Sequence, residues 1–193
     1  MNTLLLATHN QGKIREFEGF LSPLGIALKS AEDFKLPEPE ETGKTFAENA
    51  ILKAQAACDA TGLPCLADDS GLVIDALDGA PGIYSARWAG PEKDFKAAMQ
   101  RVHDELGGMD GTQTARFVAV LALVLPDGTQ EVFDGTAEGV LTWPMRGENG
   151  FGYDPFFVPE GYEITFGEME PSQKKLLSHR AKAVEKFLRY LKR

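Results

Sequence analysis

The chain has 193 residues, of which 43% are hydrophobic, and this length and composition predict one globular domain, residues 1–193, with a sizeable buried core. Its 29 acidic residues outnumber 20 lysines and arginines, and the net charge of -9 disfavours a polymeric nucleic-acid partner, because such a surface repels a phosphate backbone. The charge does not exclude a small anionic ligand, since a few cations and a divalent metal can dominate the field locally.

Neither the N-terminal residues nor the apolar runs and cysteines indicate export or membrane association. Residues 1–8 lack a basic segment followed by a long apolar one, and no apolar run in the chain approaches the thickness of a bilayer. Cys58 and Cys65 form no CxxC pair and have no histidine at zinc-ligand spacing. We therefore expect a cytoplasmic protein with no membrane partner and with two partly buried free thiols.

Short apolar runs alternate with segments of helical apolar spacing, and one pair of runs flanks a Pro-Asp-Gly turn, as in an antiparallel hairpin. The predicted strands cover 3–8, 63–67, 72–77, 116–125 and 130–140. The predicted helices cover 14–21, 45–60, 95–106 and 172–192. Loops rich in glycine, proline or acids are expected at 36–43, 79–91 and 147–154. This alternation predicts an α/β protein with a mixed sheet flanked by helices.

The helix predicted over 45–60 has the clearest boundaries. Thr45 can cap its first backbone N–H groups, and Glu48, three residues later, completes a capping box. Gly62 and Pro64 end the helix. Because the capping box explains Glu48, this acid needs no catalytic role.

The loop between the first predicted strand and helix is the first candidate binding segment. Backbone N–H groups at a helix start, with a hydroxyl, an amide and an ammonium beside them, can hold phosphate oxygens. An Asx-type turn followed by a solvated lysine explains the same residues without a ligand. The segment consists of Thr8, His9, Asn10, Gln11, Gly12 and Lys13.

Acidic residues from two separate segments form the second candidate. Glu38, Glu40 and Glu41 lie in the acidic loop, and Asp68 and Asp69 follow an apolar run at a predicted strand end. Carboxylates that converge from different segments suit Mg²⁺, which prefers oxygen ligands, and one of them can also deprotonate a water molecule. Solvated acidic loops are common, so the glutamates also have an explanation without a metal.

Aromatic and basic residues in the C-terminal part form the third candidate. Aromatic rings can stack on a nucleobase, and lysine or arginine can donate to a keto oxygen or to phosphate. Each residue by itself is also explained by core packing or by the preference of cations for helix ends. The set consists of Phe151, Gly152, Tyr153, Asp154, Lys174, Ser178, His179 and Arg180.

Two common nucleotide-binding motifs are absent. The tripeptide over 43–45, Gly-Lys-Thr, ends like a P-loop, but Glu38 stands where the motif requires its first glycine. No G-x-G-x-x-G follows a predicted strand, so the dinucleotide-binding fingerprint is missing too.

Read together, these segments resemble the inosine triphosphate pyrophosphatase family, also described as Ham1-like non-standard purine nucleoside triphosphate pyrophosphatases. Six motifs occur in the family's order between residue 3 and about residue 185, which is far more specific than any one motif, and His9 lies where the family pattern is tolerant. The motifs cover 7–13, 40–50, 67–72, 79–87, 150–155 and 178–180.

The resemblance implies an elongated mixed-sheet fold with two lobes and a central nucleotide cleft, a homodimer, and a requirement for Mg²⁺. It implies that Asp69 is the proton acceptor and a metal-site residue, and that the acidic loop adds a metal ligand, Glu40 or Glu41. Glu38 stays as a third candidate for that ligand. It also implies a substrate-binding set: Thr8, His9, Asn10, Gln11, Gly12, Lys13, Ser70, Phe151, Gly152, Tyr153, Asp154, Lys174, His179 and Arg180.

The implied reaction is hydrolysis of ITP, dITP and XTP to the monophosphate and pyrophosphate, which removes deaminated purines from the nucleotide pool. Water would attack the α-phosphorus, and pyrophosphate would leave. One alternative is a pyrophosphatase for modified pyrimidine or other abnormal nucleotides. Another is a nucleotide sensor without catalysis, which the pair Asp68 and Asp69 disfavours because carboxylates near phosphates weaken binding unless a metal intervenes.

Overall fold

A six-stranded mixed sheet organises the protein, whose computed structural model describes residues 3–109 and 112–192. The strand order is β2-β1-β3-β4-β5-β6. β1 pairs in parallel with β2 and β3, whereas β5 and β6 are antiparallel, so the predicted mixed α/β sheet is confirmed. The strands are β1 (Thr3–Leu6), β2 (Ala27–Ser30), β3 (Cys65–Ile74), β4 (Thr114–Val124), β5 (Gln130–Leu141) and β6 (Phe157–Pro159).

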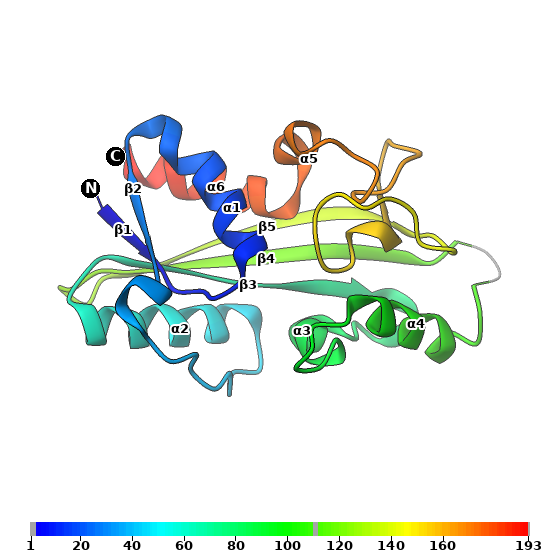
Figure 1. The fold of residues 1–193 in the computed structure, drawn as a ribbon, viewed down its shortest axis with the longest axis horizontal. Coiled ribbons are helices and arrows are strands. Elements are labelled where there is room, and N and C mark those ends of the chain that lie inside the picture. Colours follow the sequence, from blue (N-terminus) through cyan, green and yellow to red (C-terminus); the bar gives the residue numbers. More distant parts are fainter. Residues whose placement is uncertain (1–2, 110–111, 193) are drawn as a thin grey trace. The chain divides into compact units, whose positions relative to one another are not determined.

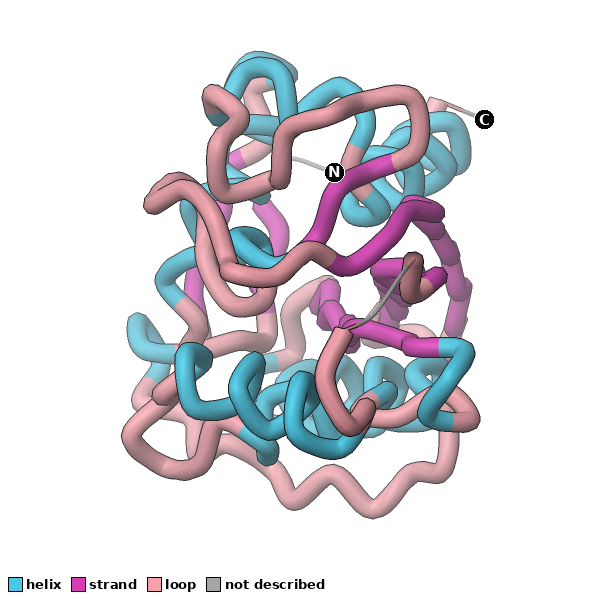
Figure 2. The backbone as a smooth tube through the Cα atoms, turned by 90° about the vertical axis from the view of Figure 1, so that its right-hand side faces the viewer, coloured by secondary structure: helices cyan, strands magenta, loops and turns pink. Residues whose placement is uncertain are grey.

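Helices lie on both sides of the strands (Figure 1 and Figure 2). None of those in the described ranges is both long enough and apolar enough to cross a membrane. The helices are α1 (Gln11–Leu21), α2 (Phe46–Thr61), α3 (Ser85–Trp88), α4 (Phe95–Glu105), α5 (Pro171–Leu177) and α6 (His179–Leu191).

The chain forms two compact units, each with its own apolar core. Unit 1 comprises the described residues of Met1–Asp69, Ala119–Asp134 and Lys182–Arg193. Unit 2 comprises those of Ser70–Val118 and Gly135–Ala181. One boundary falls within β3, between Asp69 and Ser70, so a single strand carries residues of both units.

In unit 1, α1 and α6 lie on one side of the strands and α2 on the other (Figure 1). Phe17 and Leu21 of α1 are fully buried and belong to the same core as Leu66 of β3 and Phe187 of α6. The four-residue spacing of Phe17 and Leu21 places both on one helix face. Burial of each such side chain contributes about 1.5–3 kcal/mol, so this face anchors α1 beside the sheet.

The N-terminus of α2 is capped largely as its sequence predicts. Thr45 Oγ1 accepts the backbone N–H of Glu48 at 3.1 Å. The carboxylate of Glu48 turns back as in a capping box, but it accepts from the N–H of Lys44 at 2.6 Å. The helix ends at Gly62, whose φ of 66° is the left-handed conformation that glycine adopts readily.

The hairpin predicted from the Pro-Asp-Gly turn is confirmed. β4 and β5 are neighbours in the sheet, and Leu125 N–H donates to Thr129 O at 2.9 Å across the turn. At the other end of the pair, Leu141 N–H donates to Gln113 O at 2.9 Å, as expected for antiparallel strands.

The single helix predicted over 172–192 is wrong, because the structure divides this segment into α5 and α6. Ser178 between them is extended, with φ of -67° and ψ of 157°, and its Oγ accepts the N–H of Ala181 at 3.1 Å. This side-chain bond starts a second helix and competes with continuation of the first. Leu176 of α5 is 83% exposed.

Other elements also differ from the prediction. The runs 63–67 and 72–77 were expected as separate strands with Asp68 and Asp69 at a strand end, but both acids lie inside the continuous β3. β2 and β6 were not predicted, since strands of four and three residues are too short to show periodicity. The loop expected over 79–91 contains α3.

In unit 2, hydrogen bonds through Ser85, the first residue of α3, fasten this helix and the turn before it to β3. Ser85 Oγ accepts the N–H of Leu72 at 2.9 Å and donates to Gly82 O at 2.6 Å. The hydroxyl of Tyr153 donates to Ser85 O at 2.8 Å. Only 3% of Tyr153 is exposed, and its ring packs edge-on against Phe95 with centroids 5.4 Å apart.

Replacing Thr45 with alanine should destabilise the protein by about 1 kcal/mol, because α2 loses its side-chain cap. For a chain of this size that corresponds to a fall in melting temperature of about 2–4 °C. Urea and thermal unfolding would measure both. Thr45→Ser, which keeps the hydroxyl, is the matched control and should retain wild-type stability; equal losses in the two variants would contradict the capping role.

Tyr153→Phe should cost about 1 kcal/mol near pH 8, because the hydrogen bond to Ser85 O is lost. Burial raises the pKa of the Tyr153 phenol well above its ordinary value of 10.0, so its stabilisation is complete below pH 10 and declines as pH rises further.

The advantage of about 1 kcal/mol that wild type has over Tyr153→Phe should therefore fall by about 1.4 kcal/mol between pH 8 and pH 11, so that the variant is as stable as wild type or slightly more stable at pH 11. Urea unfolding at both pH values measures it. Tyr162→Phe, at a tyrosine that is 42% exposed, is the control for loss of a phenol at the protein surface. A constant penalty for Tyr153→Phe across this range would contradict the burial argument.

Candidate functional site

The loop between β1 and α1 is held by Asn10, which caps the helix. Asn10 Oδ1 accepts the N–H groups of Gly12 at 2.9 Å and Lys13 at 3.1 Å, and its own N–H donates to Thr8 Oγ1 at 3.1 Å. The Asx-type interpretation therefore describes the local backbone. Two of the backbone N–H groups that were predicted to bind phosphate therefore already donate to this side chain.

Two other side chains of this loop contact the protein instead of projecting freely. His9 Nε2 lies 2.9 Å from Leu36 O, which joins the loop to the first residue of the acidic segment. The amide of Gln11 donates to Glu32 at 3.3 Å. His9 thus links two loops of unit 1 that are 27 residues apart in sequence.

Lys13 and Asp68 form a close ion pair on the α1 side of β3. Lys13 Nζ lies 2.5 Å from Asp68 Oδ1 and 3.2 Å from the Asp68 carbonyl oxygen. The Asp68 side chain is fully buried, and that of Lys13 is 13% exposed. A buried carboxylate requires such a partner, because an unpaired charge in this position would be strongly destabilising.

Lys53 of α2 connects the acidic loop to Asp69. Its Nζ lies 2.7 Å from Glu41 Oε1 and 3.0 Å from Asp69 Oδ1, and it also donates to the Asp68 carbonyl at 3.0 Å. Lys53 is 7% exposed. The structure therefore brings Asp69 and the acidic loop together, although they are distant in sequence.

Lys53 is not among the predicted site residues, yet the sequence contains a signal for it. The buried face of α2 consists of Asn49, Ala50, Lys53, Ala54, Ala57 and Cys58. This face recurs at helical spacing, so a lysine in its middle occupies a position where an apolar residue is expected. A lysine at a core position requires a buried acid nearby.

Asp68 and Asp69 engage cations from opposite sides because consecutive strand residues alternate between the faces of a sheet. Asp68 pairs with Lys13 of α1, and Asp69 pairs with Lys53 of α2. These helices lie on opposite sides of the strands (Figure 1). The adjacent aspartates thus belong to two separate ion pairs. The ammonium groups of both pairs donate to the same acceptor, the Asp68 carbonyl oxygen.

The three glutamates of the acidic loop differ in their surroundings. Glu38 and Glu40 are exposed, whereas the side chain of Glu41 is 24% exposed and is bonded to Lys53. Because Lys53 also bonds Asp69, Glu41 is the loop acid that the described contacts connect to the predicted catalytic residue.

Burial governs the titration of this cluster. It raises the pKa of Asp69 above its ordinary value, although Lys53 and Lys13 act in the opposite direction. Burial by itself lowers the pKa of Lys53, but the carboxylates of Asp69 and Glu41 outweigh it, so that the net shift is upward. Asp69 Oδ2 is buried and has no hydrogen-bond partner among the described residues.

The residues around Asp69 are compatible with a magnesium ion. In the described ranges no three side chains of histidine, cysteine, aspartate or glutamate are grouped to hold a metal by themselves. Mg²⁺ does not need such a group, because it is usually bound by one or two carboxylates together with substrate phosphates and water. The buried, unbonded Asp69 Oδ2 and the Glu41 carboxylate provide that donor set.

In unit 2, cations gather around the ring of Phe151. Lys174 Nζ lies 4.9 Å and the Arg180 guanidinium carbon 5.7 Å from its centroid. Lys174 also pairs with Asp154 Oδ2 at 2.7 Å, and the same oxygen accepts the N–H of Phe151 at 2.8 Å. Asp154, Lys174 and Arg180 are all at least 94% buried, given exposures of 2%, 6% and 1%.

The close fit at Asp154 explains the glycine that precedes Phe151. Gly150 has φ of 73°, and a Cβ placed there would overlap the Asp154 carboxylate. Any larger residue would displace the acid that holds both Lys174 and the Phe151 backbone. Gly152 also has a positive φ, of 67°, which aids the tight turn.

Three further predicted substrate residues have defined surroundings in unit 2. Ser70 Oγ accepts from Arg180 at 3.0 Å. His179 stacks on Phe117 with centroids 4.8 Å apart and an interplanar angle of 13°. Tyr153 is committed to Ser85 by its hydroxyl. Ser70 and Arg180 are therefore brought together, while Tyr153 supports the fold of unit 2.

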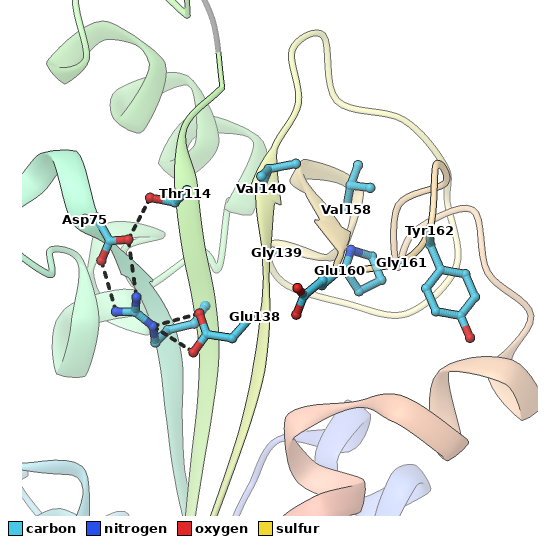
Figure 3. Close-up of a pocket in the computed structure, with 11 residues that line it drawn as sticks. Asp75, Thr114, Glu138, Gly139, Val140, Val158, Glu160, Gly161 and Tyr162 are labelled. Carbon is cyan, nitrogen blue, oxygen red and sulfur yellow. Dashed lines mark hydrogen bonds and ion pairs between the residues drawn. The ribbon is translucent and has the colours of Figure 1, made fainter.

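A separate hollow of about 560 Å³ opens on unit 2, lined by residues that include Asp75, Thr114, Glu138 and Tyr162 (Figure 3). Arg116 in its lining forms ion pairs with two acids: its Nη1 lies 3.0 Å from Asp75 Oδ1, and its Nε lies 3.0 Å from Glu138 Oε2. Hydrogen bonds from Thr114 and Arg116 lower the pKa of Asp75 and keep it charged. Because carboxylates outnumber cations there, the hollow does not suit a triphosphate, and it contains none of the predicted site residues.

Comparison with known proteins places the chain in a family. The profile of the Ham1 family matches residues 4–190. A dITP/XTP pyrophosphatase of Ruegeria pomeroyi is 55% identical over 192 residues, which cover 97% of this chain and 94% of that protein. A dITP/XTP pyrophosphatase of Rhodospirillum centenum is 56% identical over 189 residues, covering 97% and 93%.

Solved structures agree with these sequence matches. A HAM1 protein from Coxiella burnetii has a TM-score of 0.89 and 39% identity, covering 100% of this chain and 99% of that one. The Staphylococcus aureus Ham1 protein has a TM-score of 0.86 and 39% identity, with 98% of both chains covered. With the ordered motifs and the fold in agreement, the chain belongs to the Ham1 family.

Proposed function

We propose that this protein hydrolyses ITP, dITP and XTP to the monophosphate and pyrophosphate. Relatives that are more than half identical over nearly the whole chain are named dITP/XTP pyrophosphatases, which supports this reaction. The observation that carries the proposal is the cluster in unit 1, where Lys53 joins Glu41 to Asp69 and Lys13 pairs with the neighbouring Asp68.

Asp69 is the proton acceptor in this proposal. Its Oδ2 is buried and has no partner in the described part of the chain, so it can accept a proton from a water molecule. Burial raises its pKa toward the range where a carboxylate is an effective base, while Lys53 keeps the charged form accessible. General-base assistance of this kind contributes about 10²- to 10⁴-fold to the rate.

Asp69 and Glu41 are the proposed magnesium ligands, and Glu41 is preferred to Glu40 and Glu38 because it is the loop acid bonded to Lys53. Bound Mg²⁺ would supply charge neutralisation at the phosphates. Lys13 lies beside the same aspartates and would contribute a further positive charge where phosphate oxygens are bound. Thr8 to Gly12 are proposed as its neighbours in that subsite.

Phe151 with Lys174 and Arg180 is the proposed base-binding group. The half-buried ring offers a stacking surface, and the two cations near it can donate to an acceptor. Hypoxanthine and xanthine carry a 6-keto acceptor where adenine carries an amino donor, so these donors favour the deaminated bases. Guanine shares the keto group, and its rejection requires a contact that disfavours its 2-amino edge.

Two further properties stay predictions: the homodimer that the family resemblance implies and the cytoplasmic location expected from the sequence. Light scattering coupled to size-exclusion chromatography would measure the mass of the assembly against the 21.0 kDa chain. A monomeric mass at enzyme concentrations used in assays would contradict the dimer.

Asp69→Asn should lower kcat for pyrophosphate release from ITP by at least about 10²- to 10⁴-fold, because it removes the base and a metal-site charge. The assay measures pyrophosphate and orthophosphate separately at saturating Mg²⁺. Asp59→Asn, at an exposed acid of α2, is the control and should retain wild-type activity. Near-normal turnover by folded Asp69→Asn would remove this residue from the mechanism.

Steady-state rates with a base panel test substrate choice. ITP and XTP should be preferred to ATP and GTP, and Phe151→Leu should lower kcat/KM for ITP by about 10-fold or more, because a stacking contact is worth about 1–3 kcal/mol. Phe34→Leu, at a ring that is 40% exposed in unit 1, is the matched control.

Comparable rates for all four purine nucleotides would refute the selectivity, and preference for modified pyrimidines would favour that alternative class. Tight ITP binding without release of any phosphate product would instead favour the sensor.

A further inference from the structure

The N-terminal turn of α2 holds the end of the acidic loop at successive points. Lys44 N–H donates to Glu48 Oε2 at 2.6 Å, and Gly43 N–H donates to Asn49 Oδ1 at 2.8 Å. Glu41, two residues earlier, is bonded to Lys53 at 2.7 Å. The loop residue that faces Asp69 is therefore fixed through its own side chain and through the backbone that follows it.

Asn49 is the most buried of the side chains that make these contacts. It is 1% exposed, and its Nδ2 is buried without a partner among the described residues. A polar side chain buried at this cost is expected to be retained for the hydrogen bond that it makes. That bond goes to the backbone of the acidic loop at Gly43.

Gly43 fits against Asn49 so closely that no side chain can replace its hydrogen atom. A Cβ at this position would lie 2.6 Å from Asn49 Oδ1, 2.7 Å from Glu48 Cβ and 2.9 Å from Asn49 N. Two of these atoms belong to the main body of α2 and cannot swing away. The contact is therefore specific from both sides, and either partner can be changed to break it.

Asn49 and Lys53 are four residues apart and lie on the same buried face of α2. One binds the loop backbone at Gly43, and the other binds the Glu41 side chain. The ion pair alone leaves Glu41 partly exposed, at 24%, and its long side chain retains rotational freedom. The contact at Gly43 restricts the backbone that carries this side chain, so the carboxylate can reach fewer positions.

We propose that Asn49 is a positioning residue that fixes the acidic loop so that Glu41 is presented to the metal site at Asp69. This inference rests on the proposed function, because it acts through the role of Glu41 as a magnesium ligand. Residues that orient metal ligands typically change metal affinity or activity by about 10- to 100-fold when removed.

Hydrogen–deuterium exchange of metal-free protein tests the contact itself. Asn49→Ala and Gly43→Ala should both accelerate exchange in the segment 36–45. Unchanged exchange in both alanine variants would overturn the proposal.

The magnesium concentration that gives half-maximal pyrophosphate release from ITP tests the consequence. Asn49→Ala, Gly43→Ala and Glu41→Gln should each raise it by about 10- to 100-fold. The double variant Asn49→Ala/Glu41→Gln should need no more magnesium than Glu41→Gln alone, because both changes remove the same contribution. Multiplying effects would show that Asn49 does not act through Glu41 and would overturn the proposal.

Thr45→Ala is the matched control for destabilisation of α2, because it removes the helix cap and leaves the Gly43–Asn49 contact in place. It should keep the wild-type magnesium requirement. If Asn49→Ala behaves like Thr45→Ala, with lower stability and an unchanged requirement, Asn49 is merely structural and the proposal fails. Failure of the proposed function is distinct, since wild-type protein would then release no pyrophosphate.

Discussion

Charge buried along β3 is the constraint on which unit 1 depends. Asp68 and Asp69 are 1% and 5% exposed, and a carboxylate in such surroundings is tolerated only with a cation close to it. Alternation along the strand directs one acid toward α1 and the other toward α2. Each helix must therefore present a lysine, Lys13 or Lys53, and must lie at the distance that this ion pair allows. The acids thus determine how two helices meet the sheet.

The same constraint brings Glu41 to the site. Two carboxylates near each other repel. Burial raises the pKa of Asp69, and the negative charge of Glu41 raises it further. The ammonium of Lys53 between them offsets the repulsion and holds both oxygens in place. An arrangement that tolerates two acids around one positive charge is also suited to a divalent cation with an anionic substrate. Stability and the proposed chemistry therefore depend on the same electrostatic balance.

Features set by neighbouring residues could be predicted from the sequence, whereas those set by distant contacts could not. The cap at Thr45 and the hairpin at the Pro-Asp-Gly turn involve residues a few positions apart, and both were found. The pairing of Lys53 with Asp69 spans 16 positions, and no periodicity reveals it. Glu38, Glu40 and Glu41 look alike in sequence because their difference lies in which one meets α2. The break at Ser178 was missed because a serine within a helical pattern can either continue or restart a helix.

Asp69 and Asp154 show why residue type alone does not assign a role. Both are buried acids paired with a lysine, Lys53 for the first and Lys174 for the second. Asp154 Oδ2 accepts from Lys174 and from the Phe151 backbone, and Gly150 packs against it. This oxygen therefore stabilises the conformation of its loop. Asp69 Oδ2 has no donor among the described residues. A carboxylate oxygen without an internal donor remains able to bind a cation or accept a proton, and for that reason we propose the chemical role for Asp69 and a supporting role for Asp154.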